Sequence, residues 1–207
     1  ILVLIGVALS LWAQGRVNST FSRYSRVRSM TGMTGAEAAR RLLNAQGIYD
    51  VTVQQIAGEL TDHYDPRTKT VNLSQSVYGA TSVAAIGVAA HECGHAMQDN
   101  EGYAPLRFRS ALVPVANFGS SLSWPLILLG LVFGGLGSPL VEIGILMFSL
   151  AVLFQLVTLP VEYNASARAV RLLDAQGILA GEEVNGTRKV LNAAALTYVA
   201  AAATSIL

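Results

Sequence analysis

Two long runs without charge constrain this chain more than any other feature of its sequence. Residues 118–136 contain no charged side chain, and residues 141–159 contain only Glu142. A helix needs about 20 predominantly apolar residues to cross the hydrocarbon core of a bilayer. The Gly-Ser-Pro sequence at 137–139 is typical of a tight turn between the two runs. The sequence therefore predicts a transmembrane helical hairpin.

Both ends of the sequence are also apolar. Residues 1–13 are shorter than a full crossing, and we expect part of a first membrane helix there; a cleaved signal peptide competes with this interpretation, but no small-residue cleavage site follows. Residues 193–207 form either a fourth crossing or a helix packed against the others through alanines. Glycine-rich and alanine-rich faces of this kind pack within one chain or between protomers, so an oligomer stays open.

Charge is scarce and nearly balanced. Only 13% of the residues are charged, against about 25% in soluble domains. The net charge of +1 gives no reason to expect a nucleic-acid partner. Ten of the 14 Lys and Arg residues lie between positions 16 and 109, the other four lie between 168 and 189, and none lies in the hairpin turn. Positive residues near membrane helices stay in the cytoplasm, which places residues 14–117 and 160–192 there.

The segment between the first two apolar stretches predicts short elements. Residues 17–29 suit a basic helix at the lipid surface, or equally a solvated linker. Thr34 and Glu37 form a capping-box pattern at the start of a helix that Gly47 ends. The following residues predict a small antiparallel β-sheet with strands at 51–56, 59–64 and 70–74. A helix capped by Ser82 is then expected at 82–100.

The sequence His-Glu-Cys-Gly-His at 91–95 lies within that helix. Four positions turn a helix by about 400°, so His91 and His95 lie on one face and can bind one zinc ion. Glu92 is placed to act as general base, since zinc lowers the pKa of a bound water to about 7 and a carboxylate can pass its proton to the leaving amine. The alternative is two surface histidines, but the flanking apolar run buries the helix.

A catalytic zinc site needs a third protein ligand. Cys93, the single cysteine, points away from the metal face and can form no intrachain disulfide. Glu162 stands out because a carboxylate just after Pro160 has no reason to face lipid, although a carboxylate at a helix start is also favoured by the helix dipole. The other candidates are His63 and the remaining acidic residues near the polar segments, namely Asp62, Asp65, Asp99, Glu101, Asp174, Glu182 and Glu183.

Five segments carry a resemblance to a known family: LTDHYDP, VNLS, VAAHECGHAMQ, TLPVEYNASARA and ALTYVAAA. They resemble the YugP-type neutral zinc metallopeptidases of bacterial membranes, a family similar in layout to the HtpX-type gluzincins. The resemblance implies a zincin-like fold with His91, His95 and Glu162 as zinc ligands and Glu92 as the base. The HtpX-like pattern has an aspartate where this chain has Ser166, so Ser166 or Asn164 is expected to support the ligands instead.

Substrate contacts follow from the same comparison with zincins. The strand before the metal helix commonly binds an extended peptide along its edge, which assigns this role to residues 71–74. A further donor is needed for the tetrahedral intermediate. We favour His63 over Tyr64, Tyr163 and Arg168, with a turn-capping role for His63 as the alternative.

The sequence as a whole predicts a mainly α membrane protein with a small antiparallel sheet, in which a gluzincin-like core stands on three to four transmembrane helices. Its expected function is a multi-pass zinc endopeptidase of the inner (plasma) membrane that cuts membrane-associated polypeptides from the cytoplasmic side. An intramembrane protease of the site-2 type would need an aspartate within a span. A metal-dependent scaffold protein would not need Glu92. The chain is expected to begin with a partial membrane helix (1–13) and a catalytic region (14–117). A membrane hairpin (118–159), a segment with the third ligand (160–192) and a final membrane or membrane-packed helix (193–207) follow.

Overall fold

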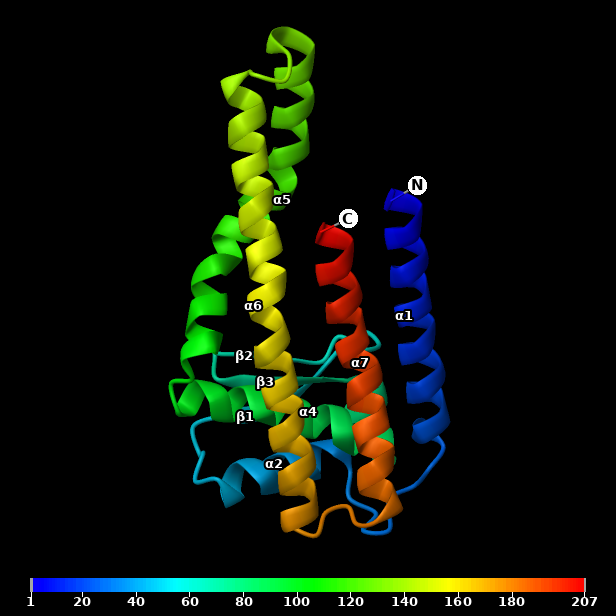
Figure 1. Ribbon diagram of the computed structural model, residues 1–207. Coiled ribbons are helices and arrows are strands. Elements are labelled where there is room, and N and C mark those ends of the chain that lie inside the picture. The colour runs from blue at the N-terminus through cyan, green and yellow to red at the C-terminus, as the bar shows by residue number, and fades with distance from the viewer. Residues whose placement is uncertain (1, 207) are drawn as a thin grey trace.

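The computed structural model describes residues 2–206, so Ile1 and Leu207, the outermost residues of the predicted end regions, lie outside it. Helices dominate these residues, which confirms the mainly α class. The elements in chain order are α1 (Leu2–Ser25), α2 (Gly35–Ala45), β1 (Thr52–Ile56), β2 (His63–Asp65), β3 (Thr70–Ser74), α3 (Gln75–Tyr78), α4 (Val83–Asn100), α5 (Ala104–Gly134), α6 (Pro139–Ala175) and α7 (Glu182–Ile206). In Figure 1 the hairpin of α5 and α6 extends past the ends of α1 and α7, and the sheet, α2 and α4 gather at the other end.

Three helices of the described chain, α5, α6 and α7, are long and apolar enough to cross a membrane. Glycines let α5 and α6 pack closely, since a Cβ at Gly119 would lie 2.6 Å from the carbonyl oxygen of Met147. The turn at 135–138 joins them as predicted. Helix α1 is not among the three, and a membrane position for its apolar part stays a prediction.

The helices run further than the sequence predicted. The sequence analysis ended the membrane hairpin at residue 159, directly before Pro160, but α6 continues through this proline to Ala175. A proline removes one backbone hydrogen bond, and tertiary contacts offset this loss because Val161 and Ala165 are fully buried just after it. Residues 17–25 likewise continue α1, so neither the separate surface helix nor the linker forms there.

The sheet is mixed, which corrects the prediction of an antiparallel one. Its strand order is β1-β3-β2, with β1 parallel and β2 antiparallel to β3. The connection from β1 to β2 carries the chain across β3, and a turn then pairs β2 with β3 as a hairpin. Strand β3 is therefore central and buried throughout. The predicted strand 59–64 is also shorter, because only residues 63–65 pair.

Helix α4 lies at the centre of the polar half of the molecule. Ser82 caps it by accepting a hydrogen bond from the Ala85 N–H, and Thr34 and Glu37 form the expected capping box on α2. Glycines on α4 permit close neighbours: a Cβ at Gly94 would lie 2.6 Å from the carbonyl oxygen of Ala165 on α6. This close contact brings the middle of α6 against the face of α4 that carries His91 and His95.

Candidate metal centre

Two histidines of α4 and one glutamate of α6 meet at this contact. Glu162 Oε2 lies 3.2 Å from His91 Nε2 and 3.5 Å from His95 Nε2. The Glu162 side chain is only 3% exposed. Among residues 2–206, these three side chains form the one group of His, Cys, Asp or Glu close enough to hold a metal ion.

The spacing and the donor types fit zinc. A tetrahedral zinc ion with bonds of about 2.0–2.1 Å separates its ligand atoms by roughly 3.3 Å, and the two measured separations of 3.2 and 3.5 Å are close to this value. Two imidazole nitrogens and one carboxylate oxygen are a donor set used by catalytic zinc, which leaves a fourth position open.

Hydrogen bonds behind the histidines fix their ring orientation. His91 Nδ1 lies 3.1 Å from Ser166 Oγ, and His95 Nδ1 lies 3.0 Å from Gln98 Oε1. When each Nδ1–H donates to these oxygens, each Nε2 keeps a lone pair that can coordinate an ion between it and Glu162. Ser166 thus occupies one of the two supporting positions considered from the sequence.

Gln98 is a supporting residue that the sequence analysis missed. It is fully buried, and its amide nitrogen donates to the Val161 carbonyl at 2.9 Å and to Asn164 Oδ1 at 3.0 Å. It therefore links His95 to the turn of α6 that carries Glu162. Its position one helical turn after His95 could have indicated that its side chain reaches the imidazole.

Glu92 is next to His91 in the sequence but is not one of the three converging ligands. Its side chain is buried, and it makes no hydrogen bond to another side chain within residues 2–206. Burial raises the pKa of this carboxyl above its ordinary value. A carboxylate that has no side-chain partner and lines the same cavities as His91 and Glu162 is available to exchange a proton with a ligand.

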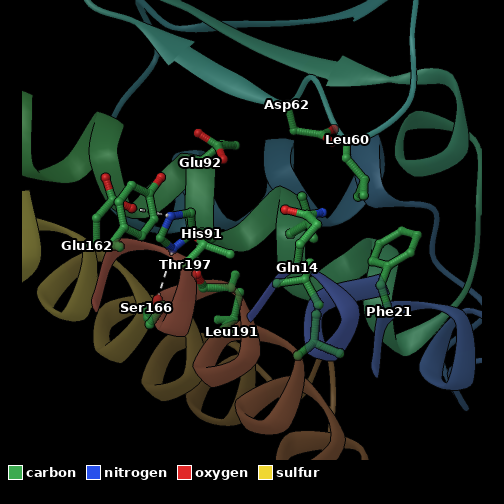
Figure 2. Close-up of a pocket in the computed structure, with 16 residues that line it drawn as sticks. Gln14, Phe21, Leu60, Asp62, His91, Glu92, Glu162, Ser166, Leu191 and Thr197 are labelled. Atoms are coloured by element: carbon green, nitrogen blue, oxygen red, sulfur yellow. Dashed lines mark hydrogen bonds and ion pairs between the residues drawn. The ribbon is translucent and has the colours of Figure 1, made fainter. Parts of the chain in front are cut away.

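Two cavities meet at the metal centre, and both are lined by His91, Glu92, Glu162 and Tyr198. The larger has a volume of about 780 Å³ and lies between β2 and α5. The smaller, of about 250 Å³, extends toward α1. Figure 2 shows this smaller cavity, with Glu92, His91 and Glu162 at one end and Gln14, Leu60 and Phe21 at the other. Space for a ligand thus exists on both sides of Glu92.

His63 lies in the wall of the larger cavity. Its Nδ1 is 2.9 Å from the Thr61 carbonyl oxygen, and its Nε2 is 3.2 Å from Asn72 Nδ2. Both ring nitrogens are therefore engaged within the hairpin, which matches the alternative of a structural histidine. Its role toward a substrate stays a prediction.

The other predicted donors have partners elsewhere. Tyr64 Oη donates to Asp99, Arg168 bonds to Asn164 and Glu101, and the Tyr163 side chain is exposed on another face of α6. Asp62, a ligand candidate, accepts hydrogen bonds from the backbone and side chain of Ser74. None of these residues therefore belongs to the group of three converging ligands.

Arg109 and Tyr198 are near the centre although the sequence analysis did not single them out. Arg109 Nη2 lies 3.7 Å from Glu162 Oε1, and its buried Nε has no partner among the described residues. Tyr198 belongs to α7 and lines both cavities. Both sit within long apolar helices, where neither periodicity nor motif distinguishes them, although the resembling segment ALTYVAAA contains Tyr198.

Asp99 gives the fold a pH dependence that can be measured. Partial burial raises its pKa, but hydrogen bonds from Lys69 Nζ and Tyr64 Oη, both at 2.8 Å, outweigh this effect and lower it overall. Its contribution to stability is therefore present above the unfolded pKa of about 3.9 and is lost as pH falls through the lower folded value. We expect Asp99→Asn to destabilise the protein by about 1 kcal/mol at pH 7.

Thermal unfolding in detergent from pH 7 to pH 2 tests this expectation. The difference between Asp99→Asn and the native protein should shrink toward the acid end. Asp174→Asn, at an exposed position, serves as the matched control and should leave the unfolding temperature unchanged. A constant difference across the pH range would contradict the charge-based explanation.

Comparisons with known proteins agree with the assignment of zinc to this metal centre. The sequence profile of the family described as "Putative neutral zinc metallopeptidase" matches residues 1–207. The "Putative membrane protease YugP" of Bacillus subtilis (strain 168) is 50% identical over 205 residues, which cover 99% of this chain and 90% of that protein. No solved structure matches the chain. The comparisons thus point to the same metal as the donor set.

Proposed function

Because this chain belongs to the family described as "Putative neutral zinc metallopeptidase", we propose that it is a membrane-embedded zinc endopeptidase with a gluzincin-like centre. The observation that carries the proposal is the meeting of His91, His95 and Glu162 at zinc-like spacing beside a buried, unbonded Glu92. A structural site would require the three ligands, but not an additional carboxylate facing two cavities.

The residues of the chain divide the chemistry between them. Zinc held by His91, His95 and Glu162 supplies a Lewis acid that makes water a better nucleophile at neutral pH. Glu92 accepts the proton of the attacking water and delivers it to the amide nitrogen as the carbon–nitrogen bond breaks. Arg109 and Tyr198 are placed to donate hydrogen bonds to the negative charge that develops on the carbonyl oxygen.

The strand order moves the expected binding site of an extended substrate from β3 to β2. Strand β3 was assigned this role from the sequence, but both of its edges are already paired. Strand β2 is at the edge of the sheet, and all three of its residues line the larger cavity. A substrate that adds to β2 would run past Glu92 and bind mainly through its backbone, which demands an unfolded segment rather than a defined sequence.

The membrane position follows from the charge distribution. The apolar helices α5 and α6 carry no Lys or Arg at the turn that joins them, whereas all 14 Lys and Arg residues lie within residues 16–109 and 168–189. We infer that the polar half lies in the cytoplasm at the plasma membrane. Its substrates are then membrane proteins or proteins close to the membrane surface.

The direct test uses protein purified in mild detergent. Elemental analysis is expected to find about one zinc per chain, and the sample should cleave an unfolded, fluorescently labelled casein. A chelator should stop the cleavage, and added zinc should restore it. Absence of zinc after purification with the metal supplied would refute the proposal, and zinc without cleavage of any unfolded protein would favour a scaffold role.

Tyr198→Phe should lower kcat by about 100-fold while zinc content stays unchanged, because only one donor to the transition state is removed. The measurement is kcat and KM on a labelled peptide, together with zinc per chain. Tyr49→Phe changes a tyrosine that is 78% exposed and lines neither cavity, and it is the matched control. An equal kcat for Tyr198→Phe and the native protein would assign the donor role to Arg109 or His63 instead.

A further inference from the structure

A second cavity system lies outside the metal centre, where α1, α6 and α7 meet. It is a groove of about 670 Å³. Helix α1 and helix α7 face each other across it, and Tyr163 of α6 forms part of its wall. Apart from the tyrosines Tyr24 and Tyr163, its polar lining comes from α1 and α7 and consists of Arg16, Ser19, Thr20, Arg23, Lys189 and Asn192.

The groove is strongly one-sided in charge. Three cations line it, and no carboxylate does. Arg16, Arg23 and Lys189 form no ion pair with any residue in the described range 2–206. The adjoining groove between α6 and α7 adds Arg171 and Arg188 against the single carboxylate of Asp174. Like charges gathered without counter-ions cost free energy, which an anionic ligand would relieve.

The two arginines are arranged to act together. They are seven residues apart on α1, so they lie on the same face, two turns from each other. Lys189 approaches from α7 on the other side of the groove. Guanidinium groups bind phosphate through paired hydrogen bonds, and an ammonium adds a point charge. Two forks, one ammonium and several hydroxyl and amide donors are a complementary set for a phosphate ester.

The groove lies at the level where the helices change from apolar to polar. Helix α1 is apolar over residues 2–13 and then reaches Arg16, α6 is apolar up to Leu159, and α7 is apolar from Ala193 onward. Trp12 lies one turn before Arg16 and is 54% exposed, as is typical of tryptophan at a membrane interface. In the proposed orientation, this level coincides with the phosphates of the cytoplasmic leaflet.

From this arrangement we infer that the groove is a binding site for the phosphate ester of an anionic phospholipid headgroup. The bound phosphate joins α1 to α7, two helices that also form the walls of the smaller cavity at the metal centre. The inference does not depend on peptidase activity, because it concerns a different face of α6 and α7.

Trp12 can report on this site directly. The chain has two tryptophans, so Trp124→Phe leaves Trp12 as the single tryptophan reporter. The protein is placed in phosphatidylcholine nanodiscs that contain brominated phosphatidylglycerol or brominated phosphatidylcholine, and quenching of Trp12 is compared. We expect about tenfold preference for phosphatidylglycerol, and loss of that preference in the triple variant Arg16→Gln, Arg23→Gln, Lys189→Gln.

The matched control removes the same charge elsewhere. Arg26→Gln, Arg28→Gln and Arg107→Gln change three exposed cations outside the groove lining and should keep the preference. Trp12→Phe, which leaves Trp124 in the hairpin, should show none. Circular dichroism checks that every variant keeps its helical content.

Binding of radiolabelled inorganic phosphate in neutral detergent separates the two sources of the ligand. Phosphatidylglycerol preference that 10 mM phosphate does not reduce indicates the lipid. Phosphate binding that the triple variant abolishes, without any lipid preference, indicates a free phosphate in the same groove. The inference is overturned if the native groove shows neither, or if the triple variant behaves like the native protein.

Discussion

Glu92→Gln should lower the rate of peptide-bond cleavage by about 1,000-fold and leave the zinc content at about one per chain. Glutamine has the same shape as glutamate but cannot accept the proton of the attacking water. The residue is not among the three whose ligand atoms converge, so metal binding should persist. Elemental analysis and a labelled peptide assay on the same preparation measure the two quantities together.

Glu59→Gln is the matched control for this change. Glu59 is an exposed glutamate of the loop between β1 and β2, and its substitution should leave both quantities unchanged. Cleavage by Glu92→Gln within tenfold of the native rate would exclude Glu92 as general base. If the prediction holds, the inactive variant should retain bound polypeptides, which makes it a tool for isolating substrates from membranes.

Glu162→Ala should weaken zinc affinity by at least about 100-fold and abolish activity with it, because the centre would keep only two ligands. A ligand that binds only the folded state stabilises it by about 4 kcal/mol at a concentration 1,000 times its Kd. The native protein should therefore unfold at a lower temperature after treatment with a chelator. In Glu162→Ala the chelator should have little effect.

Glu101→Ala is a suitable control, since it removes a half-exposed carboxylate that pairs with Arg168 and is not among the three converging ligands. It should retain both zinc and its response to the chelator. Unchanged zinc binding in Glu162→Ala would spare the enzyme but would move the third ligand to His63 or another carboxylate. The two experiments thus separate loss of the base from loss of the metal.

Local features of the fold were predictable because their causes are local. The Thr34–Glu37 capping box and the Ser82 cap depend on residues within one helical turn, and both form as expected. The strand at residues 70–74 was also found with its correct bounds. The long uncharged runs fixed the hairpin, because a bilayer-length apolar helix has few alternatives.

The errors came from choices that depend on distant residues. The path of the chain across β3 decides which strand lies in the centre of the sheet. The residue pattern of a single strand does not indicate that path. The continuation of α6 through Pro160 depends on packing against α4, where Gly94 leaves room for the backbone at Ala165. A proline judged by itself predicts the end of a helix.

The candidate site divides in the same way. Helical periodicity fixes how His91, Glu92 and His95 lie relative to one another, so the sequence alone determined that the two histidines share one face of α4. The resemblance already named Glu162 as third ligand and Ser166 as a possible support. The tertiary structure showed that both meet the histidines from another helix, placed Gln98 behind His95, and showed Arg109 and Tyr198 beside the cavities. The physical reason is that a helix sets the spacing within itself, whereas the approach of two helices is set by the small residues and buried contacts of the whole core.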